Sequence, residues 1–283
     1  MYCVLKPLIV QNSNKPSLNP FHFLLLVLSS VLIAAAGYVI NDYFDLNIDR
    51  INKPDRLIVQ KVISRRYAIA WHFFLSIAGI AIGFYLDFTT HVTLLGFSNL
   101  ACACLLFLYS VSLKKKLLSG NILISLLTAW TVLIVTWCEA RFFFSASLSL
   151  SRILRLTIMY SGFAFVTSLI REAIKDMEDI DGDMRFGCRT MPIVWGINAS
   201  KIYTAVWMTI LGIALLVLQM YVLQFHWWLL TLYCLVFVFL PLLDAFRKLF
   251  KAQTAKDFHK LSSMIKLIML TGILSMIFFR FYY

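Results

Sequence analysis

The chain has 283 residues, of which 61% are hydrophobic and only 14% are charged. Its mean hydropathy of +0.82 excludes a water-soluble globular protein, because so apolar a surface is not tolerated in water. The formal net charge of +12 does not indicate nucleic-acid binding, since the basic clusters lie between apolar segments long enough to cross a bilayer. The composition therefore predicts an integral membrane protein without a nucleic-acid partner.

Eight apolar segments reach the roughly 20 residues that a helix needs to cross the hydrocarbon core. In chain order they are 21–45, 66–86, 91–113, 120–143, 153–175, 198–223, 226–248 and 262–281. The stretch 1–10 is also apolar but much shorter, and we expect it to be the end of a ninth helix whose beginning is absent. The sequence predicts an all-α fold, a polytopic membrane helical bundle that forms a single domain over residues 1–283.

The basic residues fall on alternate loops between these segments. The loops 46–66, 114–116, 171–201 and 246–266 carry twenty of the 26 Lys and Arg residues. Loops rich in Lys and Arg remain on the cytoplasmic side of a membrane. We therefore expect a multi-pass protein whose basic loops face the cytoplasm.

Carboxylates are concentrated at two of the expected cytoplasmic helix ends. Ten of the 14 acidic residues lie within or beside residues 41–49 and 176–183. Both stretches contain the spacing D-x-x-D-x-x-x-D. Steps of three and four residues place three side chains on one face of a helix. The stripes are Asp42, Asp45 and Asp49 in the first stretch, and Asp176, Asp179 and Asp183 in the second.

Three like charges on one helical face repel each other and call for a cationic partner. Carboxylate oxygens suit Mg²⁺, which takes one or two protein carboxylates and fills its other positions with water and phosphate oxygens. Two facing stripes would hold Mg²⁺ ions and, through them, a diphosphate. The alternative is that the aspartates are solvated or paired with neighbouring basic residues, but two matching stripes at the ends of spans favour a functional site.

Basic residues follow the acidic stretches closely. Lys53 and Arg56 come shortly after the first stripe, and Lys114 follows Tyr109 at the end of another expected span. Cations in these positions could neutralise a departing diphosphate. Cytoplasmic loops are basic in any case, so a purely topological interpretation of each Lys or Arg stays open.

At these residues the sequence resembles the UbiA superfamily of intramembrane aromatic and lipid prenyltransferases. Four motifs carry the resemblance: N-D-x-x-D-x-x-x-D at 41–49; Asn52-Lys53-Pro54-Asp55-Arg56; Tyr109-Ser110 with Lys114 and Gly120-Asn121; and R-E-x-x-K-D-x-x-D-x-x-x-D at 171–183. The resemblance runs from about residue 20 to the C-terminus. It implies nine helices around a lipid-accessible cavity, with the first helix truncated here, capped on the cytoplasmic side by the loops after the motif helices.

The resemblance also implies roles for individual residues. The six aspartates of the two stripes would hold Mg²⁺ and the diphosphate. Asn41 would position the head of the prenyl chain, and Tyr109 would lie near the allylic carbon. Five basic residues would be diphosphate ligands, namely Lys53, Arg56, Lys114, Arg171 and Lys175.

The second acidic motif is similar to that of the branch that includes geranylgeranylglyceryl-phosphate geranylgeranyltransferases. We therefore expect Mg²⁺-dependent transfer of a polyprenyl group, with geranylgeranyl favoured, from its diphosphate to a lipid or aromatic acceptor, for example geranylgeranylglyceryl phosphate. The expected partners are thus a polyprenyl diphosphate, a hydrophobic or lipid acceptor and membrane lipid. The expected location is a bacterial or archaeal cell membrane, with the active site facing the cytoplasm. An alcohol acceptor would need a base, and Asp181 or Glu172 could serve.

Two alternatives stay open at this point. One is an aromatic prenyltransferase acting on 4-hydroxybenzoate or another quinone precursor, which would use the same motifs. The other is a cation transporter, although transporter sites usually lie near the middle of the membrane on interrupted helices, whereas these stripes lie at helix ends.

Overall fold

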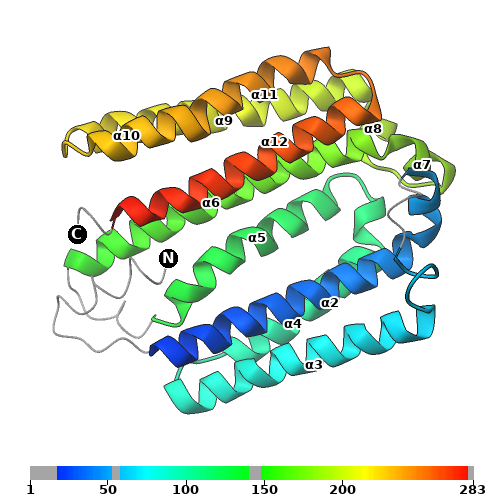
Figure 1. Cartoon of the computed structure of the whole chain (residues 1–283), viewed down its shortest axis with the longest axis horizontal. Helices are drawn as coiled ribbons and strands as arrows, with labels where there is room; N and C mark the ends of the chain where they lie inside the picture. The colour runs from blue at the N-terminus through cyan, green and yellow to red at the C-terminus, as the bar shows by residue number, and fades with distance from the viewer. Residues whose placement is uncertain (1–17, 53–57, 140–147, 280–283) are drawn as a thin grey trace.

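The structure is a computed structural model that describes residues 18–52, 58–139 and 148–279 (Figure 1). Long helices run side by side along most of the molecule, and in these ranges the extended backbone pairing consists of one bridge, between Val59 and Ile63. The all-α prediction is therefore confirmed. The expected end of a first helix, at residues 1–10, lies outside the described ranges.

The first half of the chain contributes α2 (Pro20–Asn52), α3 (Arg65–Thr90), α4 (Leu95–Val111), the short η2 (Leu113–Lys115) and α5 (Ser119–Trp137). The second half contributes α6 (Leu148–Glu178), the short helices α7 (Ile180–Arg185) and α8 (Met191–Val194), and then α9 (Ile197–Leu223). It ends with α10 (Trp228–Cys234), η4 (Leu235–Phe239), α11 (Leu240–Lys251), α12 (Ala255–Leu274) and η5 (Ser275–Phe278).

Each of the eight expected spans overlaps a helix or a continuous run of helices, and residues 140–143 of the fourth span and 280–281 of the eighth lie outside the described ranges. In the described part of the chain, six helical stretches are long and apolar enough to cross a membrane: α2, α3, α5, α9, α10 to α11, and α12 with η5. The other two are α4, which is apolar but has 17 residues, and α6, whose C-terminal end carries the charged second motif. The charges on α6 belong to the site described below.

Glycines and buried polar groups hold α2, α3 and α4 together. A Cβ atom on Gly79 of α3 would lie 2.7 Å from Cγ1 of Ile33 on α2, so only glycine allows this close approach. Ser29 Oγ donates a hydrogen bond to the Gly79 carbonyl (2.7 Å), and Asn99 Nδ2 of α4 donates to Ser29 Oγ (2.8 Å). Small residues and interhelical hydrogen bonds stabilise helix pairs in lipid, where hydrophobic burial contributes little.

The second half of the bundle has a larger apolar core. Buried side chains of α6, α9, α11 and α12 pack there, among them Ile174, Met208, Leu249 and Phe258. The run from α10 to α11 passes through the π-helical η4 before Pro241. Because Pro241 has no backbone N–H to donate to the Phe237 carbonyl, that carbonyl is open to Thr271 Oγ1 of α12, which donates to it at 2.8 Å.

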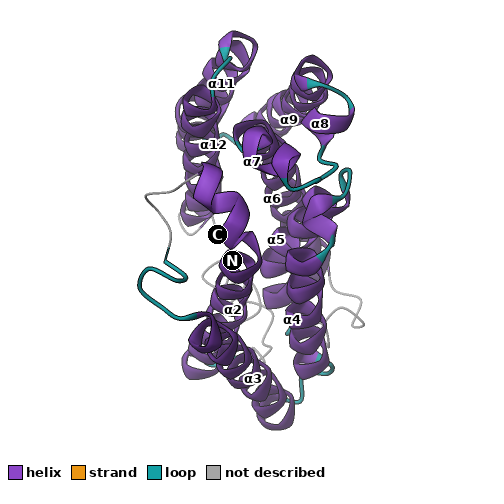
Figure 2. Cartoon of the chain, turned by 90° about the vertical axis from the view of Figure 1, so that its right-hand side faces the viewer, coloured by secondary structure: helices purple, strands orange, loops and turns teal. Residues whose placement is uncertain are grey.

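Helix ends that carry the acidic stretches lie at the same end of the bundle, which we call the motif end. It is the right-hand end in Figure 1, where α7 and α8 lie, and it faces the viewer in Figure 2. The short helix η2 also contacts the segment after α7, because the Arg189 backbone N–H donates a hydrogen bond to the Lys115 carbonyl (2.7 Å). The loops after α4 and after α7 therefore share one side of the membrane.

This arrangement predicts the accessibility of single cysteines. In a protein whose native cysteines are replaced by serine, K116C, R185C and K256C should react with a membrane-impermeant thiol reagent from the cytoplasmic side, because all three positions are exposed near the motif end. H91C, at the exposed turn between α3 and α4, should react from the opposite side. Labelling of K116C and R185C from opposite sides would contradict the arrangement.

Candidate active site

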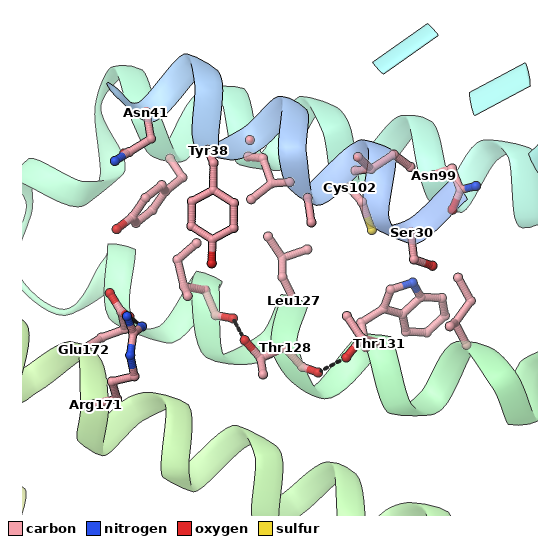
Figure 3. A pocket seen from close by; sticks show the side chains of 18 of the residues that line it. Ser30, Tyr38, Asn41, Asn99, Cys102, Leu127, Thr128, Thr131, Arg171 and Glu172 are labelled. Atoms are coloured by element: carbon pink, nitrogen blue, oxygen red, sulfur yellow. Dashed lines mark hydrogen bonds and ion pairs between the residues drawn. The ribbon is translucent and has the colours of Figure 1, made fainter. Parts of the chain in front are cut away.

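An elongated cavity of about 340 Å³ lies between α2, α4 and α5, and α6 closes it at the motif end (Figure 3). Its walls are mainly apolar, with Ile33 of α2, Leu106 of α4 and Leu127 of α5 among them. A Cβ atom on Gly37 would lie 2.9 Å from Leu106 Cδ1, so glycine at this position lets α2 approach α4. The cavity can hold a hydrocarbon chain that runs along the helices.

A second, polar pocket of about 240 Å³ lies beside this cavity at the motif end. Carboxylates of both acidic stretches line it: Asp42, Asp45 and Asp49 of α2, and Asp179 at the end of α6. Three residues, Tyr38, Asn41 and Lys175, line the polar pocket and the apolar cavity alike. A molecule with an anionic head and an apolar tail can therefore occupy both spaces at once.

The first stripe lies on one continuous helix, as expected, and its central carboxylate has a partner from another helix. Asn41 Nδ2 donates to Asp45 Oδ2 (2.7 Å). Lys114 Nζ of η2 forms an ion pair with the other Asp45 oxygen and donates to Asn41 Oδ1 at 3.2 Å. Burial lowers the pKa of the Lys114 ammonium, and the Asp45 charge opposes this shift.

The second stripe differs from the prediction that its three aspartates share one helical face. The helix ends at Glu178, and Asp179 has non-helical backbone angles (φ −97°, ψ 9°) before α7 begins at Ile180. Asp176 lies before this break and accepts a hydrogen bond from Asn121 Nδ2 of α5 (2.8 Å). Asp179 lines the polar pocket, and Asp183 lies on α7. The break separates residues that helical spacing had placed together.

Glu172 is a buried carboxylate between two cations on α6. Its side chain is 7% exposed, and its Oε1 atom accepts a hydrogen bond from Arg171 Nη1 at 2.5 Å. Lys175 Nζ lies 3.8 Å from Glu172 Oε2. All three residues line the apolar cavity, together with Tyr109 of α4, so this charged group and the aromatic ring meet at the inner side of the polar pocket.

Four of the described residues expected at the site line neither pocket, namely Lys114, Asp176, Asp181 and Asp183. Asp181 is exposed on α7. Lys53 and Arg56 lie outside the described residues. The sequence analysis missed Tyr38, which lines both pockets. It precedes Asn41 by three residues and Asp42 by four, so helical spacing could have placed it on the same face.

The carboxylates of the polar pocket fit a magnesium site that is completed by substrate. Among the described residues, no group of three or more His, Cys, Asp or Glu side chains is close enough together to hold one ion. Mg²⁺ usually takes only one or two carboxylates and binds phosphate oxygens at its other positions. The hard oxygen donors of α2 and Asp179 line one pocket from two parts of the chain and match that requirement.

The position of Lys114 depends on Gly120. A Cβ atom on Gly120 would lie 2.8 Å from the Lys114 Cα atom, so Gly120→Ala must displace the backbone of η2. We expect this substitution to lower the free energy of unfolding by about 1–3 kcal/mol, measured by thermal unfolding in detergent. Gly162→Ala on α6 is the matched control, because its Cβ would meet no atom within 4 Å. Equal stability of the two variants would contradict the close contact.

Comparison with known proteins places the chain in a family. The model of the UbiA prenyltransferase family matches residues 8–270. The digeranylgeranylglyceryl phosphate synthase of Korarchaeum cryptofilum is 31% identical over 266 residues, which cover 93% of this chain and 88% of that protein. The enzyme of the same name from Methanothermobacter thermautotrophicus is 36% identical over 192 residues, which cover 67% of this chain but only 62% of that protein.

Two solved structures have a similar fold. A UbiA homologue from Aeropyrum pernix K1, solved in its apo form, superposes with a TM-score of 0.70 at 16% identity, over 97% of this chain and 95% of that chain. A UbiA homologue from Archaeoglobus fulgidus, bound to DMAPP and Mg²⁺, gives a TM-score of 0.57 at 14% identity, over 96% and 94%. The family match extends over most of the sequence, and the chain is therefore a membrane-embedded enzyme of the UbiA prenyltransferase family.

Proposed function

We propose that the protein transfers a geranylgeranyl group from its diphosphate to the free hydroxyl group of geranylgeranylglyceryl phosphate. The observation that carries this proposal is the junction of the two pockets: a space lined by carboxylates opens into an apolar cavity, and Tyr38, Asn41 and Lys175 line both. A prenyl diphosphate has the same division into an anionic head and an apolar chain. Two relatives are named for a digeranylgeranylglyceryl phosphate product.

Mg²⁺ is part of the proposal, and it would be held by Asp42, Asp45, Asp49 and Asp179. When bound, it would neutralise the diphosphate and make it a better leaving group. The UbiA homologue of A. fulgidus was solved with DMAPP and Mg²⁺, which supports a similar use of the carboxylates here. Lys114 and Lys175 add protein charges beside this pocket, and they can stabilise the charge that the diphosphate gains as it leaves.

The remaining steps use residues that line the apolar cavity. The ring of Tyr109 can stabilise an allylic cation by a cation–π contact worth about 0.5–2 kcal/mol, and the apolar walls exclude water that would capture the cation. The acceptor oxygen forms a bond to C1 while the bond from C1 to the diphosphate oxygen breaks and diphosphate leaves with the electron pair. Glu172, which is buried beside Tyr109 in the cavity lining, can take the hydroxyl proton.

Arg171 favours an acceptor that carries a phosphate. Its Nη1 atom binds Glu172, but its Nε atom is buried and has no hydrogen-bond partner among the described residues. A buried donor without a partner costs free energy, and a phosphate oxygen of the acceptor would supply a charge-assisted partner. An aromatic carboxylate could accept the same hydrogen bond, so 4-hydroxybenzoate is the alternative acceptor that the experiment must include.

The proposal is tested by supplying the purified protein with labelled geranylgeranyl diphosphate and one acceptor at a time. We expect a mass-spectrometric product from geranylgeranylglyceryl phosphate with Mg²⁺ and none in excess EDTA. Asp45→Asn should reduce the rate strongly, because it removes the charge at the centre of the first stripe.

Each outcome of this assay has a separate meaning. Transfer only to 4-hydroxybenzoate would reject the lipid acceptor and keep the prenyltransferase activity. Full activity in EDTA would reject the magnesium role of the aspartates. Failure to consume geranylgeranyl diphosphate, while a shorter prenyl diphosphate is consumed, would reject the donor alone.

A conservative change at Arg171 tests the acceptor more sharply. Arg171→Lys keeps the positive charge but removes the planar group of N–H donors. We expect the KM for geranylgeranylglyceryl phosphate to rise about tenfold, which corresponds to about 1.4 kcal/mol, with little change in the KM for the donor. Arg155→Lys, at an exposed position on the same helix, is the matched control and should leave both values unchanged. An equal rise in both KM values would place Arg171 at the diphosphate instead.

A further inference from the structure

The side-chain amide of Asn52 bridges the two acidic motifs. Asn52 is the last residue of α2, three residues after Asp49 of the first stripe. Its Nδ2 atom donates to the Asp179 carbonyl (3.0 Å), and its Oδ1 atom accepts a hydrogen bond from the Gly182 backbone N–H (2.9 Å). The donor and the acceptor of this one amide therefore both form hydrogen bonds with the backbone of the second motif, 127 and 130 residues further along the chain.

The contact occurs where the second motif is least regular. Asp179 lies between α6 and α7 with φ −97° and ψ 9°, and the Asn52 amide binds the backbone on both sides of Ile180. The Asp179 carbonyl also accepts a hydrogen bond from the Asp183 N–H (3.1 Å), so the Asn52 amide adds a second bond to it. At the Gly182 N–H, Asn52 Oδ1 supplies the acceptor, and a backbone N–H near a helix end needs such a partner. Asn52 thereby stabilises the turn that directs Asp179 to the polar pocket.

Gly182 makes room for this amide. A Cβ atom on Gly182 would lie 2.5 Å from Asn52 Nδ2 and 2.6 Å from Asn52 Oδ1, and its third near atom would be Asn52 Cγ. Its φ value is not in the left-handed region, since Gly182 lies within α7. A Cβ atom at this position would therefore displace the Asn52 amide, while the backbone conformation itself does not call for glycine.

The opposite end of the same segment is also held. The Cys188 N–H donates to the Asp183 carbonyl (3.0 Å), and the Arg189 N–H donates to the Lys115 carbonyl (2.7 Å). The segment that carries Asp179 and Asp183 is therefore attached to α2 through Asn52 and to η2 through Arg189. Of these two attachments, Asn52 is the one that joins the second motif to the helix of the first stripe.

We propose that Asn52 is a positioning residue that sets the spacing between Asp179 and the carboxylates of the first stripe, so that both sides of the polar pocket reach the same metal–diphosphate group. The inference rests on the proposed function for the metal and the diphosphate. It adds a residue that touches neither group and acts through the backbone of Asp179. Removing the amide should weaken Mg²⁺ binding more than it slows the reaction once Mg²⁺ is saturating.

The test uses Asn52→Ala, Gly182→Ala and the double variant, all as full-length protein in nanodiscs. We expect Asn52→Ala and Gly182→Ala each to raise the Mg²⁺ concentration for half-maximal transfer about tenfold, as changes behind metal ligands commonly do, with a much smaller change in kcat. The double variant should be no worse than Asn52→Ala, because removing the Asn52 amide leaves space for the Cβ atom that Gly182→Ala introduces, and the two effects share one contact.

A second readout does not depend on activity. In the metal-free protein, backbone amide hydrogen exchange over α7 should be faster in Asn52→Ala, because the Gly182 N–H loses its acceptor. Asn47→Ala, at an exposed position on the same helix, is the matched control and should change neither exchange nor the Mg²⁺ requirement. If Asn52→Ala does not fold, Gly182→Ala carries the same test with Asn52 retained.

Three results would contradict the proposal. Unchanged hydrogen exchange in Asn52→Ala would show that the Asn52 amide does not hold α7. Faster exchange with an unchanged Mg²⁺ requirement would show that it holds α7 without positioning the carboxylates, and additive effects in the double variant would contradict a contact shared by Asn52 and Gly182. Failure of the wild-type protein to transfer a prenyl group with Mg²⁺ would instead count against the proposed function, and the exchange experiment would still decide whether the bridge exists.

Discussion

The structure depends on the requirement that a group of carboxylates at the end of an apolar bundle be neutralised. Isolated charges are costly to bury, and the structure meets this cost with a different partner at each site. Asp45 has Lys114 and Asn41, Glu172 lies between Arg171 and Lys175, and Asp176 accepts a hydrogen bond from Asn121. The partners come from α2, α4 to α5, and α6, so satisfying the charges also joins the helices that surround the cavity.

This requirement explains the short connection between α4 and α5. Lys114 reaches Asp45 only because η2 follows α4 at once and turns back closely against the start of α5, where Gly120 lies against the Lys114 backbone. The next residue, Asn121, donates a hydrogen bond to Asp176. One tight turn thus supplies a partner to each acidic motif. Tyr109, before this turn, and Ile124, after it, both line the apolar cavity.

Much of this arrangement could be predicted from the sequence, because it follows from regular helices. The spans follow from segment length and hydropathy, and Asp42, Asp45 and Asp49 share a face because α2 continues without interruption to Asn52. The second stripe could not be placed in the same way. The break at Asp179 is in contact with Asn52, which is distant in sequence, and Asp181 beyond it is exposed on α7. Spacing rules apply only within one helix.

The choice of acceptor is harder to predict for a related reason. In this proposal the acidic motifs bind the diphosphate, which leaves in the same way whether the acceptor is a lipid or an aromatic ring. The spacing of the motifs therefore cannot distinguish the two acceptors. The residues that could distinguish them lie on the inner side of the shared boundary formed by Tyr38, Asn41 and Lys175. There, Arg171 is held against Glu172 by one nitrogen, while its buried Nε atom has no hydrogen-bond partner among the described residues. In the function we propose, this guanidinium binds the anionic group of the acceptor, and because a phosphate and a carboxylate both accept hydrogen bonds from it, the arginine in the motif does not by itself tell the two acceptors apart.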